Sequence, residues 1–257
     1  MDLNSRQRQL LEQIRLHGFG SVEQLAAQFG VTMQTIRRDI NRLTEARLLR
    51  RYHGGAGLPS SVENIAYQQR QVLNIAGKRA IAQQVARQVE NGQSLIINIG
   101  TTNEEIARAL MQHERLSVIT NNLNVATILA DNPGHEVIVA GGIVRSRDRA
   151  VTGEATSDFI RQFQVDIGII GISSIEADGT LRDFDYREVQ VAQAIIAQSR
   201  QVWLVADHSK FGREALVRLG HVEQIDALFT DAAIPAALEE LLEQLGVRVW
   251  IGEAGDE

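Results

Sequence analysis

Residues 32–43 read Thr32-Met33-Gln34-Thr35-Ile36-Arg37-Arg38-Asp39-Ile40-Asn41-Arg42-Leu43, and this stretch decides the fold of the N-terminal part of the chain. Its apolar residues Ile36, Ile40 and Leu43 recur at the i, i+4, i+7 spacing of one helix face. Thr32 is a suitable N-cap, because its hydroxyl can accept a hydrogen bond from the first turn. The other positions are mostly polar or basic. The stretch therefore predicts an amphipathic helix with a buried stripe and a basic face.

The basic face of this helix has two interpretations. An isolated helix of this composition is commonly a solvated surface helix. Alternatively, polar residues in the first turn followed by arginines suit a helix that enters the major groove of DNA. Arg37 and Arg38 would then reach phosphates or a guanine edge. The neighbouring segments decide between the two.

Two further helices are predicted before this one, at residues 5–17 and 21–29. The second begins at Ser21 in the pattern of a capping box, and only Gly30-Val31 separates it from the basic helix. Two helices joined by so short a turn are typical of a helix-turn-helix motif. Residues 48–57 follow, a basic segment that ends in Gly54-Gly55-Ala56-Gly57, and they predict a β-hairpin wing that can lie on DNA. Residues 1–58 thus predict a winged helix-turn-helix domain.

The charge distribution agrees with a DNA-binding N-terminal part. The net charge of the 257-residue chain is −6, which alone argues against a nucleic-acid binder. Residues 1–55, however, contain nine Arg and five acidic residues, a net charge of +4, so the remainder carries −10. A small basic module is thus joined to a larger acidic one, and this asymmetry needs an explanation.

Composition excludes several other classes. The chain has no Cys, so it forms no disulfides and no Cys-ligated metal site. Its N-terminus is polar and lacks the apolar core of a signal peptide. No apolar run reaches membrane-spanning length. We therefore expect a cytoplasmic protein without membrane association, resident metal or cofactor.

The rest of the chain predicts a tether and a larger α/β domain. Residues 59–73 contain Pro59-Ser60-Ser61 and no clean period, which indicates a linker that can include a short helix. Residues 74–257 begin with a helix at 76–90, and apolar runs then alternate with helical segments. The strands are expected at residues 95–99, 116–120, 137–140, 166–170, 202–206, 227–230 and 247–251. The further helices are expected at residues 103–113, 122–131, 154–163, 186–199 and 235–245. Uninterrupted Ile/Val-rich strands between helices indicate a largely parallel sheet covered on both faces.

Ligands of such sheets bind beyond the carboxyl ends of the strands, and the loop at residues 98–104 is the first candidate. In its sequence Asn-Ile-Gly-Thr-Thr-Asn-Glu, Gly100 permits close backbone approach, and Thr101 and Thr102 supply hydroxyls. The N-terminus of the following helix would direct N–H groups at an anion. The loop thus predicts a phosphate cradle, although it lacks the Gly-Lys-Ser/Thr of a Walker loop. The alternative is an ordinary tight turn with a Thr N-cap.

Polar side chains follow several other strands and could complete a ligand site. Lys210 is a natural second partner for a phosphate. Asp183, Asp185 and Glu188 could accept hydrogen bonds from sugar or polyol hydroxyls. The alternatives are a surface or subunit-contact loop for Arg145 and Arg147, and helix N-terminal charge for Asp185 and Glu188. The predicted effector-binding residues are Asn98, Gly100, Thr101, Thr102, Asn121, Asn122, Arg145, Asp183, Asp185 and Lys210.

Two N-terminal motifs resemble the DNA-binding domain of the DeoR family of bacterial repressors. Residues 31–40, Val-Thr-Met-Gln-Thr-Ile-Arg-Arg-Asp-Ile, are similar to the family pattern V-S-x-x-T-I-R-R-D-L, and residues 53–56 match its H-G-G-A. The resemblance implies that Thr35, Arg37 and Arg38 contact operator DNA, whereas we expect Asp39 to be structural. The predicted DNA-binding residues are Thr32, Gln34, Thr35, Arg37, Arg38, Arg42, Arg51 and His53.

The resemblance extends over the whole chain. The loops of residues 74–257 are similar to the DeoR-family effector and oligomerisation domain, which implies the fold of ribose-5-phosphate isomerase, a small phosphorylated metabolite as effector, and a homo-oligomer, dimer or tetramer. The family loop usually reads D-x-G-T-T, and Asn98 stands where Asp is usual. Segments such as Thr120–Ala126 and Asp207–Arg213 resemble more narrowly a member of the family whose effector is sn-glycerol 3-phosphate. That narrower resemblance implies a repressor of glycerol catabolic genes that this effector releases from DNA.

An enzyme of the same fold is the competing class. A sugar-phosphate isomerase needs acidic residues and a Lys around the substrate carbonyl to move a proton. Here Gly171-Ile172-Ser173-Ser174 follows the strand where such enzymes carry acids, and no Lys lies between Lys78 and Lys210. We therefore expect no catalysis. The closer alternative is a repressor of the same family that responds to another sugar phosphate.

Overall fold

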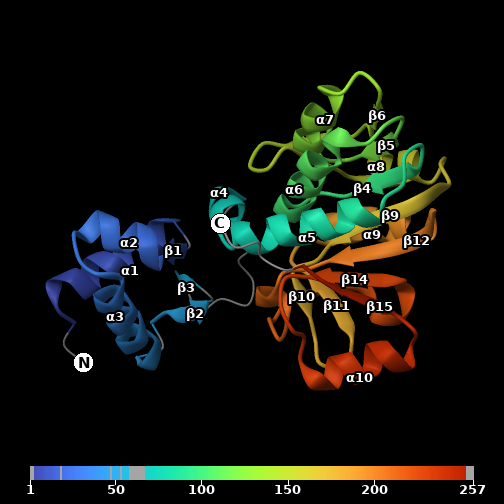
Figure 1. The fold of residues 1–257 in the computed structure, drawn as a ribbon. Helices are drawn as coiled ribbons and strands as arrows, with labels where there is room; N and C mark the ends of the chain where they lie inside the picture. Colours follow the sequence, from blue (N-terminus) through green and yellow to red (C-terminus); the bar gives the residue numbers. More distant parts are fainter. Residues whose placement is uncertain (1–2, 18, 47, 53, 58–66, 253–257) are drawn as a thin grey trace. The chain divides into compact units, whose positions relative to one another are not determined.

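The structure of the chain is a computed structural model that describes residues 3–17, 19–46, 48–52, 54–57 and 67–252. The chain forms two compact units, Met1–Asn74 and Ile75–Glu257 (Figure 1). We describe each unit separately.

The first unit is a winged helix-turn-helix, as predicted. Its helices are α1 (Ser5–His17), α2 (Val22–Phe29), α3 (Met33–Glu45) and α4 (Tyr67–Val72). Its strands are β1 (Phe19–Ser21), β2 (Arg50–Tyr52) and β3 (Gly55–Gly57), which pair in the order β1-β3-β2. The short helix expected in the linker is α4, and the linker residues before Tyr67 lie outside the described ranges. The sequence did not predict β1, because a strand of three residues is too short to show alternation.

The predicted stripe of α3 holds the first unit together. Ile36, Ile40 and Leu43 are buried in a core that also contains Leu10 and Ile14 of α1. The Oγ1 of Thr32 accepts a hydrogen bond from the backbone N–H of Thr35 at 3.3 Å, which confirms the predicted N-cap. This packing fixes α3 with its polar face outward.

The turn between α2 and α3 and the start of α2 also have local causes. Gly30 ends α2 with a φ of 62°, a left-handed conformation that glycine adopts without strain. At the start of α2, the Oγ of Ser21 accepts from the N–H of Gln24 at 3.2 Å, which is one of the two bonds of the predicted capping box. Because Gly30 ends α2 and Thr32 caps α3, both ends of the turn are fixed, and α3 follows α2 with the helix-turn-helix geometry.

The second unit is built on a seven-stranded parallel sheet. Its strands, each near a predicted one, are β4 (Ser94–Ile97), β5 (Ser117–Thr120), β6 (Glu136–Val139), β9 (Val165–Gly171), β12 (Ser199–Val205), β14 (Ala227–Thr230) and β15 (Arg248–Ile251). They lie in the order β15-β14-β12-β9-β4-β5-β6, and every neighbouring pair is parallel. The predicted largely parallel sheet is therefore confirmed.

Helices cover both faces of this sheet (Figure 1). The helices are α5 (Ile75–Gln88), α6 (Thr101–Ala109), α7 (Leu123–Ala130), α8 (Glu154–Ile160), α9 (Tyr186–Ala197) and α10 (Ala236–Gln244). Leu95 and Ile97 of β4 pack in the same core as α5, α6 and α7, whereas Ile96 packs in the core of α8, α9 and α10. Successive side chains of a strand point to opposite faces, so the Ile/Val-rich runs fill two cores at once.

Several short elements were not predicted. Strands β7 (Ile143–Arg145) and β8 (Ala150–Thr152) form an antiparallel hairpin, and β10 (Ser174–Ile175), β11 (Thr180–Asp183) and β13 (Val217–His221) form a small antiparallel sheet. Three 3₁₀ turns complete the elements: η1 (Leu110–Gln112), η2 (His208–Lys210) and η3 (Val222–Gln224). These segments are only two to five residues long, so hydrophobic periodicity does not reveal them.

The direction of chain travel reverses between β4 and β9. From β4 the chain continues outward to β5 and β6, and then returns to place β9 on the other side of β4. Ligands of open parallel sheets bind beyond the carboxyl ends of the strands at such a switch point. The predicted phosphate cradle directly follows β4, so the topology puts it at this position.

Within the described ranges, no helix combines the length and the apolar character that crossing a lipid bilayer requires.

Candidate functional site

The outward face of α3 carries most of the predicted DNA-binding residues. Gln34, Arg37, Arg38 and Arg42 are exposed. The hydroxyls of Thr32 and Thr35 lie 2.9 Å apart and are hydrogen-bonded to each other in the first turn. The helix therefore presents hydroxyls first and guanidinium groups next along one solvent-facing surface.

The wing adds one described basic residue to this surface. Arg51 on β2 is exposed, and its Nη1 donates to the Oδ1 of Asn41 on α3 at 3.4 Å. The structure thus brings the predicted wing residue Arg51 beside the recognition helix. His53, the other predicted wing residue, lies outside the described residues.

Asp39 ties α3 to α1. It is buried, and its two carboxylate oxygens accept from the Nε of Arg6 at 2.6 Å and from the Nε2 of Gln7 at 2.9 Å. This confirms the expectation that Asp39 is structural. Neither α1 partner was among the predicted site residues, because their contact with Asp39 spans more than thirty residues of sequence.

The predicted cradle is the loop of residues 98–102 and the first turn of α6. Gly100 has φ 136° and ψ 146°, a region that is essentially restricted to glycine. Thr101 and Thr102 begin α6 and are largely buried, and no side chain caps the helix. A helix N-terminus that follows such a glycine offers backbone N–H groups and positive potential to an anion.

Asn98 shapes this loop. It is 3% exposed, its Oδ1 accepts from the N–H of Ile99 at 2.8 Å, and its own N–H donates to the carbonyl of Ile169 on β9. An Asp carboxylate could accept the same backbone hydrogen bond. The Asn at this position therefore retains the loop-shaping contact.

Two buried asparagines have an acceptor atom without a hydrogen-bond partner among the residues that the structure describes. The Nδ2 of Asn103 donates to the carbonyls of Asn98 at 2.8 Å and Ile99 at 3.1 Å, and that of Asn121 donates to the carbonyl of Val151 at 3.1 Å. The Oδ1 atoms of Asn103 and Asn121 are the acceptors in question. Buried polar atoms are normally paired, so these two oxygens suit the hydroxyl donors of a ligand.

The structure brings Asp183 to the same switch point. Its Oδ1 accepts from the Oγ of Ser173 at 2.8 Å and from the N–H of Phe184 at 2.7 Å, and Ser173 lies just beyond the end of β9. A Cβ added to Gly171 would lie 3.6 Å from the carbonyl of Ile99. The loops after β4 and β9 therefore pack closely together, with Asp183 bonded to one of them.

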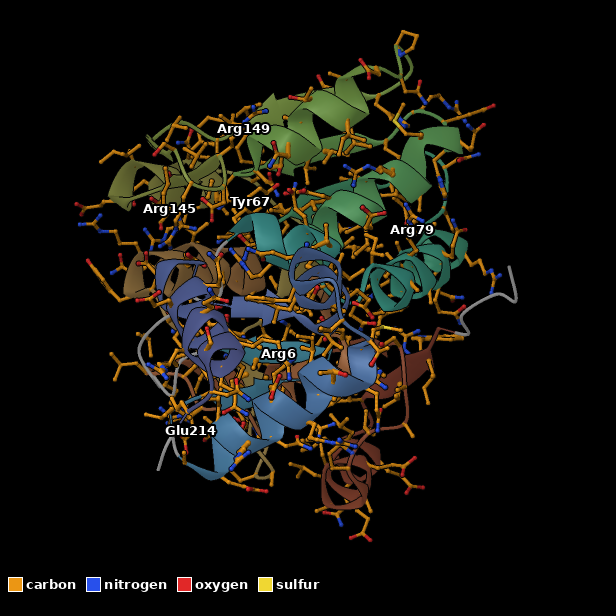
Figure 2. The ribbon with its side chains drawn as sticks, turned by 90° about the vertical axis from the view of Figure 1, so that its left-hand side faces the viewer. Arg6, Tyr67, Arg79, Arg145, Arg149 and Glu214 are labelled. Atoms are coloured by element: carbon orange, nitrogen blue, oxygen red, sulfur yellow. The ribbon has the colours of Figure 1, made fainter. Side chains whose placement is uncertain are left out.

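Arg145, which is labelled in Figure 2, lies in a cluster of charges, the Arg145 cluster, which consists of Arg145, Arg147, Asp148, Asp185 and Glu188. Its guanidinium pairs with Asp148 at 2.6 Å, with Asp185 at 3.0 Å and with Glu188. Burial alone would lower the pKa of Arg145, but the hydrogen bond and charge of Asp148 and the charge of Glu188 outweigh it and raise the pKa. Arg145 is therefore a permanent cation held by three carboxylates.

This cluster joins the β7–β8 hairpin to the start of α9. Asp185 also caps α9, since its Oδ1 accepts from the N–H of Arg187 at 2.9 Å. Asp185 thus combines helix capping, one of the alternatives considered, with an ion pair to another predicted effector residue. The hairpin in turn rests on the loop after β5 through an Asn122–Ala150 bridge.

Two neighbours of the cradle, Glu104 and Asn124, were not among the predicted site residues. Glu104 on α6 is 2% exposed and its Oε1 accepts from the Nδ2 of Asn124 at 3.0 Å. The side chain of Asn122, a predicted site residue, caps α7 by accepting from the N–H groups of Asn124 and Val125. These contacts connect the first turn of α6 to the first turn of α7.

Lys210 pairs with a buried carboxylate. Its Nζ lies 3.7 Å from the Oδ2 of Asp207 at the end of β12. Burial would raise the pKa of Asp207, but the charges of Lys210 and Lys78 and the hydrogen bonds of Ser209 lower it to about 2. Lys78 of α5 is itself 3% exposed. It was not predicted, although one sequence signal existed: it shares the apolar stripe of Ile81 and Val85 at i, i+3, i+7.

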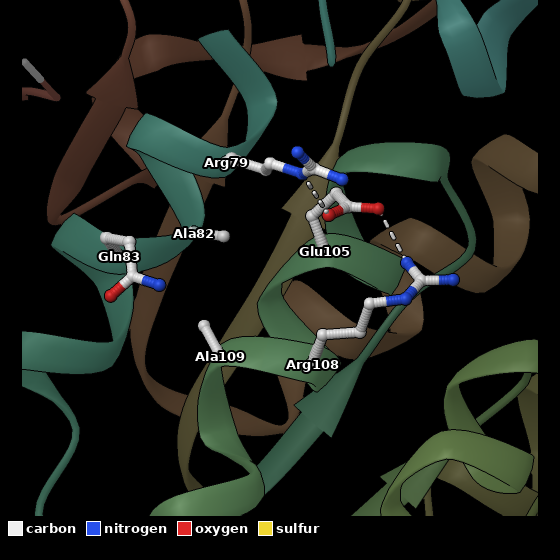
Figure 3. Close-up of a pocket in the computed structure, with 6 residues that line it drawn as sticks. All are labelled: Arg79, Ala82, Gln83, Glu105, Arg108 and Ala109. Atoms are coloured by element: carbon white, nitrogen blue, oxygen red, sulfur yellow. Dashed lines mark hydrogen bonds and ion pairs between the residues drawn. The ribbon is translucent and has the colours of Figure 1, made fainter. Parts of the chain in front are cut away.

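A separate surface pocket of about 240 Å³ lies between α5 and α6 (Figure 3). It is lined by Arg79, Ala82, Gln83, Glu105, Arg108 and Ala109. The carboxylate of Glu105 pairs with Arg79 at 3.5 Å and with Arg108 at 2.6 Å. None of the predicted effector residues lines it. In the part of the chain that the structure describes, no group of three or more His, Cys, Asp or Glu side chains is arranged so that it could hold a metal ion.

Solved structures that the chain is similar to include two of other classes. The ribose 5-phosphate isomerase A of Methanocaldococcus jannaschii has a TM-score of 0.40 and 14% identity, over 53% of this chain and 54% of that one. The translation initiation factor eIF-2B of Pyrococcus horikoshii has a TM-score of 0.49 and 17% identity, over 88% of this chain and 95% of that one. Both likenesses are weak, and no functional assignment rests on them.

Curated relatives are much more similar. The glycerol-3-phosphate regulon repressor of Escherichia coli is 48% identical over 94% of this chain and 96% of its own length. The protein of the same name from Haemophilus influenzae is 48% identical over 95% of each chain. The HTH-type transcriptional repressor CsqR of Escherichia coli is 43% identical over 96% of this chain and 94% of its own length.

Two family models match the two units. The DeoR-like helix-turn-helix domain matches residues 6–62, and the DeoR C terminal sensor domain matches residues 73–232. The family consists of transcriptional regulators and not of enzymes, which confirms the expectation that the chain is a regulator and has no catalytic activity. The chain therefore belongs to the DeoR family, and it is a DNA-binding transcriptional regulator with a C-terminal sugar-phosphate sensor domain.

Proposed function

We propose that this chain represses genes of glycerol and glycerol 3-phosphate catabolism, and that sn-glycerol 3-phosphate releases it from operator DNA. Two relatives with 48% identity over nearly the whole chain are named glycerol-3-phosphate regulon repressors. The loops that carried the narrower resemblance all lie in the sensor domain. They are the parts of the chain that an effector would contact.

The observation that supports this proposal is a helix N-terminus without a side-chain cap, together with buried acceptor atoms near the carboxyl ends of the neighbouring strands β4 and β5. The phosphate is assigned to the N-terminus of α6, at Gly100, Thr101 and Thr102, where backbone N–H groups favour a negative charge. The two hydroxyls of glycerol 3-phosphate are donors that would complement the Oδ1 atoms of Asn103 and Asn121.

Lys210 is assigned as the second cation for the phosphate. It follows β12, and β9 separates β12 from β4, so the two strand ends are about 10 Å apart. A Lys side chain extends over several ångströms and is mobile enough to span part of this distance. Ligand entry would then draw Lys210 from Asp207 toward the cradle.

The regulatory step is a change in the spacing of paired recognition helices. A homo-oligomer, dimer or tetramer, sets the distance between two copies of α3 so that they read two operator half-sites. The effector stabilises a second arrangement with a different spacing. Because the coupling is reciprocal, operator DNA lowers the affinity for the effector by the same factor as the effector lowers the affinity for DNA.

A second candidate is a repressor of the same family that responds to another sugar phosphate. The observation in its favour is the 43% identity to the CsqR repressor, which is close to the 48% of the other relatives. Both candidates share the anion site at α6. They differ in the arrangement of ligand hydroxyls from which the acceptor atoms of the site would receive hydrogen bonds.

Fluorescence anisotropy on a labelled duplex from upstream of the gene for this chain and its neighbours tests the proposal. The full-length protein is bound to the duplex and titrated with sn-glycerol 3-phosphate, glycerol, inorganic phosphate and fructose 6-phosphate. We expect release by sn-glycerol 3-phosphate alone. Release by fructose 6-phosphate without release by sn-glycerol 3-phosphate would favour the second candidate. Release by inorganic phosphate at the same concentration would contradict recognition of the polyol.

A further inference from the structure

Arg6 on α1 is held beside the recognition helix by an ion pair. Its Nε lies 2.6 Å from the Oδ2 of Asp39, and the Nε2 of Gln7 donates a hydrogen bond to the Oδ1 of Asp39 at 2.9 Å. The Asp39 side chain is 6% exposed, and the Arg6 side chain, which is labelled in Figure 2, is 35% exposed. The carboxylate is therefore turned into the protein, whereas the guanidinium, which has four more N–H donors on its Nη atoms, reaches solvent.

Arg6 and Arg51 lie on opposite sides of α3. Arg6 contacts Asp39 and Arg51 contacts Asn41, and these two α3 residues are two positions apart. Two positions correspond to a rotation of about 200° around a helix. The rest of the circumference is an arc of about 160°, and the exposed residues Gln34, Arg38 and Arg42 lie in it. The outward face of α3 thus has one arginine along each edge.

The dimensions of DNA suggest a role for the two arginines at the edges of α3, Arg6 and Arg51. A helix with its side chains is about 10–12 Å across, and the major groove is about 12 Å wide. A helix that fills the groove therefore has a phosphate backbone along each of its two sides. Residues at the two edges of the helix face phosphates of opposite strands, and bidentate guanidinium groups suit phosphates well.

We propose that Arg6 is a second phosphate clamp, which contacts one DNA strand while Arg51 of the wing contacts the other. Asp39 acts as the positioning residue, because it fixes the guanidinium in place before DNA binds. The proposal rests on the assignment of α3 as the recognition helix. It is independent of which metabolite the sensor domain binds.

The salt dependence of DNA binding tests this inference. A duplex is first selected from a random pool by the full-length protein without effector, and dissociation constants are then measured between 50 and 500 mM KCl. Each phosphate contact contributes about −0.9 to the slope of log affinity against log salt concentration. We expect Arg6→Ala to reduce the magnitude of that slope by about 0.9. The ratio of the variant's dissociation constant to that of the wild-type protein should then fall about eight-fold as the KCl concentration rises tenfold. We expect the same for Arg51→Ala, and about twice the reduction for the double variant.

Arg8 supplies the matched control. It is also an exposed arginine of α1, but it is two positions from Arg6 and its Nε donates to the carbonyl of Leu3 at 3.1 Å. Arg8→Ala removes the same charge from the other side of the helix. We expect it to leave the slope at the wild-type value.

Two further measurements separate a phosphate contact from a structural role. Arg6→Ala also removes one of the two partners of the buried Asp39, so the thermal midpoint of each variant is recorded and binding is measured well below it. Arg6→Lys keeps the charge and should restore the slope, whatever its midpoint. Arg6→Ala should lower the affinity for the selected duplex and for a scrambled duplex by the same factor, since a phosphate contact carries no sequence information. A wild-type slope in Arg6→Ala, or a slope in Arg6→Lys as low as in Arg6→Ala, would overturn the inference, whereas the wild-type protein would still bind and respond to its effector.

Discussion

The Nζ of Lys210 lies 3.7 Å from the Oδ2 of Asp207, and Asp207 is shared with a second lysine, the buried Lys78 of α5. One carboxylate thus balances two cations at the end of β12. An anionic effector that attracts Lys210 would leave Asp207 to Lys78 alone. The ion pair is therefore the contact of the candidate site that a phosphate competes with most directly.

The first prediction concerns Lys210. Lys210→Ala should bind the operator duplex as tightly as the wild-type protein but should no longer be released by sn-glycerol 3-phosphate, because a charge that binds the phosphate is lost. Anisotropy with increasing effector checks this. Arg161→Ala is the matched control: Arg161 is an exposed arginine of the same unit that pairs with the exposed Asp158. A normal effector response in Lys210→Ala would contradict the assignment of Lys210.

The second prediction concerns acid stability. The pKa of Asp207 is lowered from 3.8 to about 2 in the folded chain, by Lys210, Ser209 and Lys78 against the opposing effect of burial. A depressed carboxyl pKa contributes stability that is fully present above about pH 4 and is lost as the pH falls through about 2. The shift corresponds to about 2 kcal/mol of unfolding free energy at neutral pH.

Asp207→Asn should remove this contribution. Urea unfolding followed by tryptophan fluorescence reports on the second unit, because both tryptophans, Trp203 and Trp250, lie there. We expect a loss of about 2 kcal/mol or more at pH 7, because Asp207 then no longer balances the charges of Lys210 and the buried Lys78. The dependence of stability on pH between 4 and 2 should also become shallower. Asp158→Asn, at an exposed position, should change neither; equal effects from the two variants would contradict the role of the buried pair.

Much of the fold could be predicted from the sequence, because the signals were local. The stripe Ile36, Ile40 and Leu43 and the cap Thr32 together specify α3 within twelve residues. The strands of the large sheet are Ile/Val-rich runs, since parallel strands covered on both faces need apolar side chains at nearly every position. The loops after these strands were then identified as candidate sites from the strand ends alone.

The remainder depends on contacts between distant positions, which local patterns do not contain. Arg145 was predicted as a ligand contact, but its pairing with Asp185 and Glu188 joins segments about forty residues apart. The pairing of Arg6 with Asp39 is of the same kind. A charged residue in the sequence has no visible partner until the chain folds, so the ion pairs of Arg145 were not predictable from local patterns. Lys78 differs, because its position on the apolar stripe of α5 already indicated that it faces the core.

The third prediction concerns the recognition helix. Arg38→Ala should weaken operator binding by about 1–3 kcal/mol if Arg38 contacts a base, and should relax the sequence preference at one position of each half-site. Binding to a panel of single-base variants of the selected duplex measures this. The response to effector should be unchanged, because Arg38 lies in the DNA-binding unit. An equal loss of affinity on every duplex would show that Arg38 contacts phosphate and not a base edge.

The fourth prediction concerns Gly100. Its φ of 136° and ψ of 146° lie where a residue with a Cβ is strained by about 1–3 kcal/mol. The added Cβ would meet its nearest atom, the Nδ2 of Asn103, at 3.7 Å, so Gly100→Ala tests backbone strain without a steric clash. We expect the cradle to shift and the effector concentration for half-release to rise, with operator affinity unchanged. Gly141→Ala is the matched control, because Gly141 lacks a positive φ and its Cβ would meet nothing within 4 Å. If Gly100→Ala responds to effector like Gly141→Ala, the backbone of the loop does not hold the phosphate.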